Sequence, residues 1–352
     1  MKIIKQFACA VAVVTALTVG LAACSTGSST SNTSVAKGGG GLPEVATGAD
    51  VIKATLATLK GKKVRMVLQT VSAPLTQVWV KRMQLGFAEN GVKFDYVASE
   101  FDNQVLATQV QTAINDKVDA LIVHNYDASG LASLIKKAQA AGIYVMQINI
   151  ASNQQSDAYV GPNWDSLGAT IANRAIADCK AKGKTEMGLI TGFAADVPSV
   201  LFLDGAKRAM KAGGMKAVVT QPGQYDPSKA GDIARTVLRQ NPNTCAFVGI
   251  YDVMMVGVAK VVQDAGKTGD VGVYTIDASE GTCKAIGDGG LTAALNHTPS
   301  QMANQVVGLT LYLLQSGLKA GTARTAIFSS AVMVDKSNYN VPGACYRGEN
   351  IK

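Results

Sequence analysis

The sequence predicts an α/β protein of two lobes, each a doubly wound parallel sheet. From about Lys62 onward, short β-rich runs alternate with helical stretches, and the strand runs are continuously apolar, which is typical of parallel strands covered on both faces. About ten strand candidates suit two sheets better than one. The length of 352 residues also exceeds the roughly 250–300 at which chains usually divide into domains.

The strand candidates, in chain order, are Val64–Leu68, Val92–Val97, Ala120–Val123, Tyr144–Ile148, Met187–Ile190, Ala217–Thr220, Ala246–Ile250, Val271–Ile276, Leu291–Leu295 and Ala326–Val334. The expected helices between them are Leu75–Glu89, Gln104–Asn115, Ala128–Ala141, Leu167–Lys180, Leu201–Ala212, Ser228–Arg239, Met254–Ala265 and Gln301–Gln315. Crossovers between parallel strands are right-handed. Open sheets of this kind bind ligands beyond the carboxyl ends of their strands, so a site is expected there.

The N-terminus carries an export signal. Lys2 and Lys5 precede an apolar run too short to span a bilayer, which needs about 20 residues. The following Leu-Ala-Ala-Cys resembles a bacterial lipobox and implies a signal peptide over 1–23 and a lipidated Cys24. Residues 24–60, rich at first in Ser, Thr, Gly and Asn, predict a flexible tether. We therefore expect an exported protein, lipid-anchored to a bacterial membrane and facing the periplasm or the cell exterior.

Four cysteines remain in the exported body: Cys179, Cys245, Cys283 and Cys345. In an oxidising compartment we expect at least one disulfide, and the sequence leaves all three pairings open.

Composition and motifs exclude several classes of function. The net charge of +8 is spread without a dense Lys/Arg run, which disfavours nucleic-acid binding. The chain has two histidines, His124 and His297, and neither a Gly-x-Ser-x-Gly elbow nor a His-Glu-x-x-His helix. We expect no enzyme activity, no catalytic residue, no metal and no cofactor.

A series of motifs resembles the ribose-binding-protein-like periplasmic binding proteins, the type 1 solute-binding fold. The matching segments run in order from about Lys62 to Val334, and they include Val118–Val123, Ile143–Asn149, Val160-Gly161, Gln221–Asp226, Asn241-Pro242, Val271–Asp277 and Ala285–Gly289.

The resemblance implies two lobes joined by three chain crossings, here near Pro162, His297 and Ala331, that close on a small molecule without altering it. It implies an N-terminal lobe of 61–161 plus 297–330 and a C-terminal lobe of 162–296 plus 331–352. It also implies a monomer whose partners are a small ligand, an ABC permease and its ATPase, and the membrane through Cys24.

Family site positions carried onto this sequence give a ligand-binding set of Leu75, Thr76, Asn149, Phe202, Tyr225, Tyr251, Asp277 and His297. Apolar residues stand where the family has polar ones, as at Leu75 and Phe202, so the forked arginine contacts of the sugar binders are not expected. Buried polar groups without partners cost about 1–3 kcal/mol, so we expect a smaller or less polar sugar-like ligand or a polyol. Trp79 and Trp164 are candidates for a flat wall of the site or for the lobe cores.

Two alternatives stay open: a sensor that presents its ligand to a membrane receptor, and a binder of a nucleoside-like ligand. A repressor of related fold is excluded because it needs a DNA-binding headpiece where the signal and tether lie.

Overall fold

The computed structural model describes residues 48–125, 127 and 129–348. The predicted signal peptide and Cys24 lie outside these residues. The stretch predicted as tether is helical at its end, where α1 (Gly48–Leu59) contacts α10 and buries only Leu59. The described residues belong to one compact unit of the chain.

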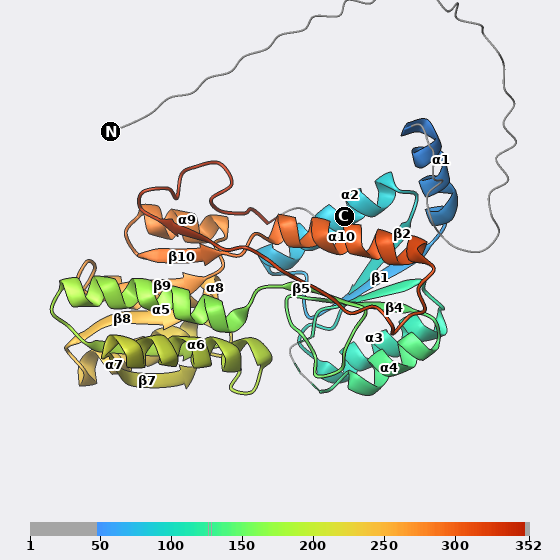
Figure 1. The fold of residues 1–352 in the computed structure, drawn as a ribbon. Coiled ribbons are helices and arrows are strands. Elements are labelled where there is room, and N and C mark those ends of the chain that lie inside the picture. Colours follow the sequence, from blue (N-terminus) through green and yellow to red (C-terminus); the bar gives the residue numbers. More distant parts are fainter. Residues whose placement is uncertain (1–47, 126, 128, 349–352) are drawn as a thin grey trace, which may run out of the picture. The chain divides into compact units, whose positions relative to one another are not determined.

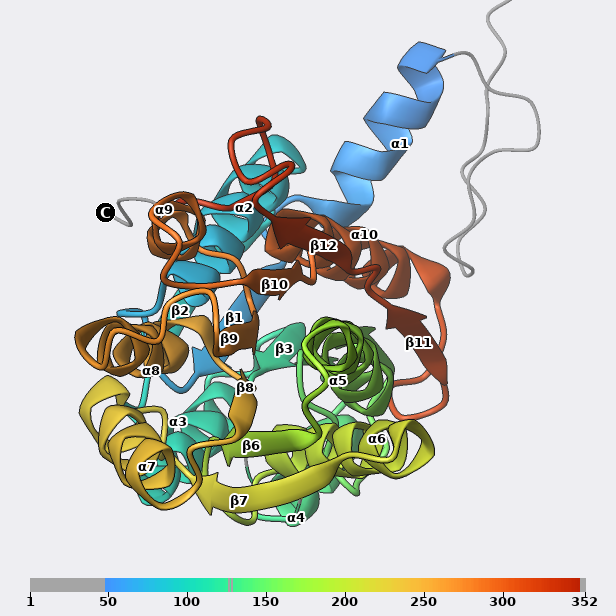
Figure 2. The same cartoon turned by 90° about the vertical axis from the view of Figure 1, so that its left-hand side faces the viewer.

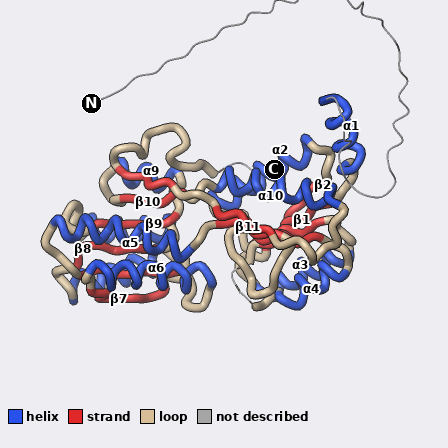
Figure 3. The backbone as a smooth tube through the Cα atoms, in the orientation of Figure 1, coloured by secondary structure: helices blue, strands red, loops and turns tan. Residues whose placement is uncertain are grey.

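Two six-stranded sheets form the framework (Figures 1 and 3). The first has the order β11-β5-β4-β3-β1-β2 and the second the order β12-β10-β9-β8-β6-β7. All neighbours are parallel except β10 and β12, which pair antiparallel. The strands are β1 (Lys63–Leu68), β2 (Lys93–Ala98), β3 (Ala120–Val123), β4 (Tyr144–Ile148), β5 (Ala158–Gly161), β6 (Glu186–Thr191), β7 (Lys216–Pro222), β8 (Thr244–Gly249), β9 (Gly272–Ile276), β10 (Ala293–Asn296), β11 (Thr325–Phe328) and β12 (Val332–Asp335).

Helices cover both faces of each sheet. On the first sheet, α2 and α10 pack on one face and α3 and α4 on the other. On the second, α5 and α6 lie on one face and α7, α8 and α9 on the other (Figure 2). The helices are α2 (Pro74–Glu89), α3 (Asn103–Asn115), α4 (Ala132–Ala140), α5 (Trp164–Ala181), α6 (Val197–Gly213), α7 (Pro227–Gln240), α8 (Asp252–Asp264), α9 (Glu280–Gly287) and α10 (Pro299–Ser316).

Glycine permits the closest helix contact. A Cβ on Gly205 of α6 would lie 1.9 Å from the carbonyl oxygen of Asp165 in α5, and one on Gly168 of α5 would lie 2.2 Å from that of Phe202. Only glycine lets two backbones approach this closely without displacement.

The chain passes between the sheets three times: between β5 and α5, between β10 and α10, and between β11 and β12. The predicted fold of two doubly wound lobes with a three-crossing hinge is therefore confirmed. The predicted strand Ala326–Val334 is in fact two, because this run contains the third crossing and its halves join different sheets. The strand β5 and the helix α9 were not predicted.

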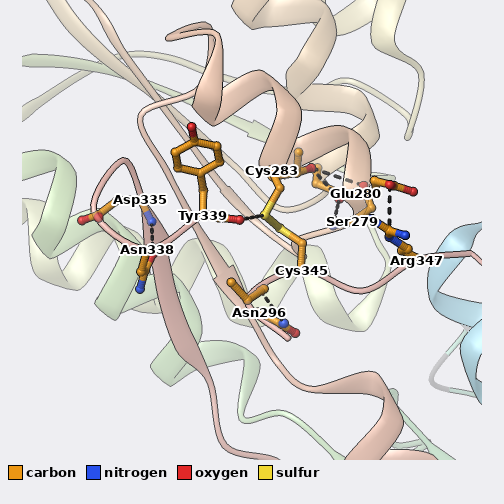
Figure 4. Close-up of a disulfide and its surroundings, with 12 residues drawn as sticks. Ser279, Glu280, Cys283, Asn296, Asp335, Asn338, Tyr339, Cys345 and Arg347 are labelled. Atoms are coloured by element: carbon orange, nitrogen blue, oxygen red, sulfur yellow. Dashed lines mark hydrogen bonds and ion pairs between the residues drawn. A yellow bond between two sulfur atoms is a disulfide. The ribbon is translucent and has the colours of Figure 1, made fainter. Parts of the chain in front are cut away.

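Two disulfides settle the cysteine pairing that the sequence left open. Cys179 of α5 bonds to Cys245 of β8, inside the core of the second lobe. Cys283 of α9 bonds to Cys345 in the C-terminal segment (Figure 4).

Candidate functional site

A cavity of about 760 Å³ opens where the carboxyl ends of strands from both sheets meet. Its walls come from the segments that follow β1, β2, β3 and β4 in the first lobe and β6, β7, β8 and β9 in the second. This is where doubly wound sheets bind ligands, and the volume is in the range of small-molecule sites.

The two lobes present matching backbone turns to this cavity. β4 and β9 occupy equivalent places in the two sheet orders, and each is followed by a residue with left-handed φ: Asn149 at 67° and Asp277 at 72°. Each donates its backbone N–H to the neighbouring strand, Asn149 to Val160 at 2.8 Å and Asp277 to Leu295 at 2.9 Å. Non-glycine residues in this region are uncommon and often mark functional sites.

Asp277 is held from behind by His297. The His297 Nε2 contacts Asp277 Oδ1, its Nδ1 lies 3.2 Å from the Met302 sulfur, and its ring lies edge-on to Trp164 at 5.8 Å. His297 has no exposed surface and does not line the cavity, whereas Asp277 does. His297 was predicted to contact the ligand, but it lies behind Asp277, away from the cavity wall. Its contact with the Asp277 carboxylate orients that side chain.

Asn149 and Trp164 join the lobes at the first crossing. The Trp164 Nε1–H donates to the Asn149 carbonyl oxygen at 2.8 Å, and the Tyr159 hydroxyl donates to the same oxygen at 3.1 Å. The side-chain Oδ1 of Asn149 is buried and has no hydrogen-bond partner in the described structure. Because Asn149 lines the cavity, a ligand donor is the natural partner of that oxygen.

Aromatic rings form the second lobe's wall. Tyr225 lies 5.6 Å from Tyr251 at an interplanar angle of 70°, and 5.3 Å from Phe193 at 69°. The Tyr225 hydroxyl donates to Asp196 at 2.7 Å. Tyr225 thus lines the cavity with its hydroxyl already bonded, and Asp196 is occupied by that bond and by the α6 N-terminus, where it accepts from Ser199 N–H.

The first lobe's wall combines apolar and polar groups. Leu75 and Thr76 lie in the first turn of α2, and the Thr76 hydroxyl donates to the Ala73 carbonyl at 2.9 Å. His124 also lines the cavity, packed edge-on against Trp79 at 5.1 Å. Burial lowers the pKa of His124 to about 3, so its imidazole is neutral at pH 7.

Behind Asp277 lies a second buried carboxylate, Asp252. It accepts from Thr282 Oγ1 at 2.7 Å and from Ser279 N–H at 2.8 Å. Burial and then the charge of Asp277 raise its pKa. Tyr346 of the C-terminal segment is buried beside both carboxylates, and burial first, then their charges, raises the pKa of its hydroxyl.

The structure brings six of the eight predicted site residues to the cavity wall: Leu75, Thr76, Asn149, Tyr225, Tyr251 and Asp277. Phe202 is fully buried in the core of the second lobe, because its turn of α6 faces α5. Trp164 both lines the cavity and packs in the core of the second lobe, whereas Trp79 lies in the core of the first lobe.

Sequence reasoning missed the loop after β2. Glu100 and Phe101 line the cavity, and both have left-handed φ, 48° and 67°. Phe193, after β6, was also missed as an aromatic residue. Phe101 and Phe193 are 44% and 40% exposed, on opposite lobes of the same cavity. The signal that could have identified them is their place directly after strands, where ligand contacts are expected.

Two lobes joined by a hinge, with a cavity lined by the segments that follow their strands, are typical of a ligand-binding protein. Consistent with this, the model of the periplasmic binding protein domain family matches residues 64–319, and the chain belongs to that family. The predicted resemblance is confirmed.

Curated relatives share this class. The chain is 29% identical over 267 residues to the D-allose-binding periplasmic protein of Escherichia coli, covering 72% of this chain and 84% of that one. It is 28% identical over 232 residues to the D-ribose/D-allose-binding protein of Pseudomonas aeruginosa, covering 64% and 70%. These relatives are binding proteins, and the prediction that the chain is not an enzyme is confirmed by them.

Solved structures share the fold. An ABC transporter solute-binding protein of Burkholderia graminis, in complex with D-arabinose, matches with a TM-score of 0.74 at 22% identity over 80% of this chain and 98% of that one. The glucose-galactose binding protein GanP of Geobacillus stearothermophilus matches with a TM-score of 0.73 at 20% identity, over 80% and 99%. Within the described part of the chain, the helices lack the length and apolar character needed to cross a membrane.

Proposed function

We propose that this chain is the extracytoplasmic binding component of an ABC importer, which captures a small sugar-like or polyol ligand between its lobes and delivers it to a permease. The observation that carries the proposal is the cavity, whose walls come from four strand ends of each sheet. Relatives whose names specify ribose and allose support the ligand class. Lipid attachment at Cys24 and the lobe boundaries at 161/162, 296/297 and 330/331 belong to the same proposal.

Closure of the hinge supplies the affinity. A ligand that contacts both lobes stabilises the closed state by the difference in its binding free energy between the two states. Asn149 of the first lobe and Asp277 of the second lie in equivalent turns and hold a ligand from both sides. Closure also shields Phe101 and Phe193 from water, which adds a favourable hydrophobic contribution.

A thermal-shift screen of the purified protein against pentoses, hexoses, deoxy sugars, polyols and nucleosides tests the proposal. A ligand at 100 times its dissociation constant stabilises the folded state by about 2.7 kcal/mol, which gives a clear shift. Asp277→Asn should abolish or strongly reduce the shift of the best sugar or polyol. Asp264→Asn removes the same charge from an exposed ion pair on α8 and should leave the shift unchanged. A response to nucleosides alone would contradict the ligand class.

A further inference from the structure

The charged side chains that line the cavity, among the described residues, are all carboxylates: Glu100, Asp226 and Asp277. No lysine or arginine belongs to this described lining. Lys229 reaches the rim, but it is exposed and its ammonium contacts the amide oxygen of Gln224. The imidazole in the lining, His124, is neutral at pH 7 because burial lowers its pKa to about 3.

The surroundings compensate these carboxylates unequally. Asp226 caps α7 by accepting from Ser228 and Lys229 N–H, so the partial positive charge of that helix end offsets it. Glu100 is exposed to water and accepts from the Thr70 hydroxyl at 2.8 Å. These two carboxylates therefore do not require a charged partner.

Asp277 differs because it is buried with a second carboxylate nearby. It is 3% exposed, Asp252 is 1% exposed, and the imidazole of His297 contacts only Asp277 of the two. The N-terminus of α2 at the opposite wall has no side-chain cap, and a helix end of this kind supplies only about half a positive charge. Asp252 accepts from Val253 N–H, Ser279 N–H and the Thr282 hydroxyl at the start of α8, so it is compensated locally. Asp277, whose partner is the His297 imidazole, is the buried carboxylate that lines the cavity, and a cation there offsets its charge when closure excludes water.

The unpaired acceptor at the site points the same way. Asn149 is 4% exposed and its Oδ1 has no partner in the described structure. Asn149 Oδ1 and the Asp277 carboxylate both accept hydrogen bonds, so a group that carries several N–H donors satisfies both. An ammonium group has three donors and no acceptor.

The aromatic wall suits a cation as well. Phe193, Tyr225 and Tyr251 stand at successive angles of 69° and 70°, so their rings enclose a corner and do not stack in parallel. A cation placed over the face of one of these rings is attracted by about 0.5–2 kcal/mol, more when it is desolvated.

We propose that the cavity prefers a ligand that carries an ammonium group, an amino sugar or amino polyol, over the same molecule with a hydroxyl in its place. This rests on the proposed function and narrows its ligand class. Acceptors from both lobes hold the ammonium group, and the aromatic residues lie against the adjoining part of the ligand.

Calorimetric titration of the purified protein with matched pairs tests this. The probes are D-glucosamine with D-glucose, D-galactosamine with D-galactose, and 1-amino-1-deoxy-D-sorbitol with sorbitol. The amine should bind about tenfold or more tightly in at least one pair, a factor that corresponds to 1.4 kcal/mol. N-acetyl-D-glucosamine, which lacks the charge, should lose that preference, and 0.5 M salt should reduce it.

Variants identify the groups responsible. Asp277→Asn should lower the affinity for the amine about tenfold more than that for its neutral partner. Tyr251→Leu, which keeps an apolar side chain without the ring, should also reduce this preference. It provides an independent test in case Asp277→Asn does not fold. Asp264→Asn is the matched control and should change neither member of a pair.

The outcomes separate the two proposals. If neutral sugars or polyols bind as tightly as their amines in all three pairs, the ammonium preference is wrong and the proposed function stands. If neither members of these pairs nor the sugars and polyols of the thermal-shift screen bind, both proposals fall.

Discussion

Removing the disulfide between Cys283 and Cys345 should both destabilise the protein and weaken ligand binding. This bond fixes a C-terminal segment that touches both lobes. In that segment the Tyr346 N–H donates to the Ala278 carbonyl at 3.0 Å, directly after Asp277, while the Tyr346 ring packs in the core of the first lobe. Arg347 then pairs with Glu280 at 3.1 Å, as Figure 4 shows.

The loss of stability follows from the loop that the bond closes. Cys283 and Cys345 are 62 residues apart. With loop-closure entropy of about 2.1 + 1.5R ln n cal/mol/K, this loop gives about 14 cal/mol/K, or about 4 kcal/mol at 25 °C. The Cys179–Cys245 bond closes a loop of nearly the same size, with a separation of 66, and gives about 4 kcal/mol as well.

The two disulfides therefore form a matched pair with different surroundings. Cys179 and Cys245 lie in the core of the second lobe and do not line the cavity, whereas the Cys345 segment places Tyr346 beside Asp277 and Asp252. Replacing each pair by alanine should lower the free energy of unfolding in urea by similar amounts. Only the Cys283→Ala/Cys345→Ala variant should also weaken binding of the best ligand, by about tenfold, since the buried support of Asp277 is released.

A single substitution separates the segment from the bond. Tyr346→Ala keeps the disulfide and should reproduce the loss of affinity, with a loss of stability of about 3–5 kcal/mol because its ring is buried. Equal affinities for the wild type, both double alanine variants and Tyr346→Ala would refute the reasoning that this segment supports the site.

Three further predictions concern pH, packing and closure. Burial holds the pKa of His124 at about 3, below its unfolded value of 6.5, so unfolding at acidic pH takes up a proton. The wild type should therefore lose about 2 kcal/mol of unfolding free energy from this group between pH 7.5 and 5. Urea titrations of His124→Gln should lack this pH-dependent loss. Gly205→Ala should cost about 1–3 kcal/mol because its methyl group meets the α5 backbone, whereas Gly308→Ala on α10, with open space around it, should stabilise by about 0.5–1 kcal/mol in the same urea assay. Phe101→Ala and Phe193→Ala should each weaken ligand binding about tenfold in calorimetry while leaving the melting temperature of the ligand-free protein nearly unchanged, since both rings are exposed before closure.

The sequence could predict the fold because the strand pattern is local. Continuously apolar runs such as 120–123 and 246–250 are buried along their whole length in the structure, as parallel strands must be. The same logic located the cavity, because the carboxyl ends of those strands meet in one place.

Which side chains point into a core and which towards the cavity was harder to predict from the sequence. Phe202 was predicted from the family resemblance to line the site but turns into the core, since the approach of α5 and α6 at two glycines determines which side of α6 is covered. His297 follows a strand, as a ligand contact would, yet its ring lies behind Asp277 because Trp164 and Met302 enclose it. Both outcomes depend on contacts between segments far apart in the chain.

The backbone conformation at Asn149 and Asp277 argues that their side chains, and not only their turns, serve the site. A left-handed conformation costs most non-glycine residues about 1–2 kcal/mol and costs Asn and Asp less, whereas glycine adopts it without that strain. The chain nevertheless has side chains at both equivalent positions, and both reach the cavity from opposite lobes. The two lobes differ in charge there, an amide after β4 and a carboxylate after β9. Under the proposed function, a ligand bound between them would meet a neutral acceptor on one side and an anionic acceptor on the other, so the pair would fix its orientation as well as its position.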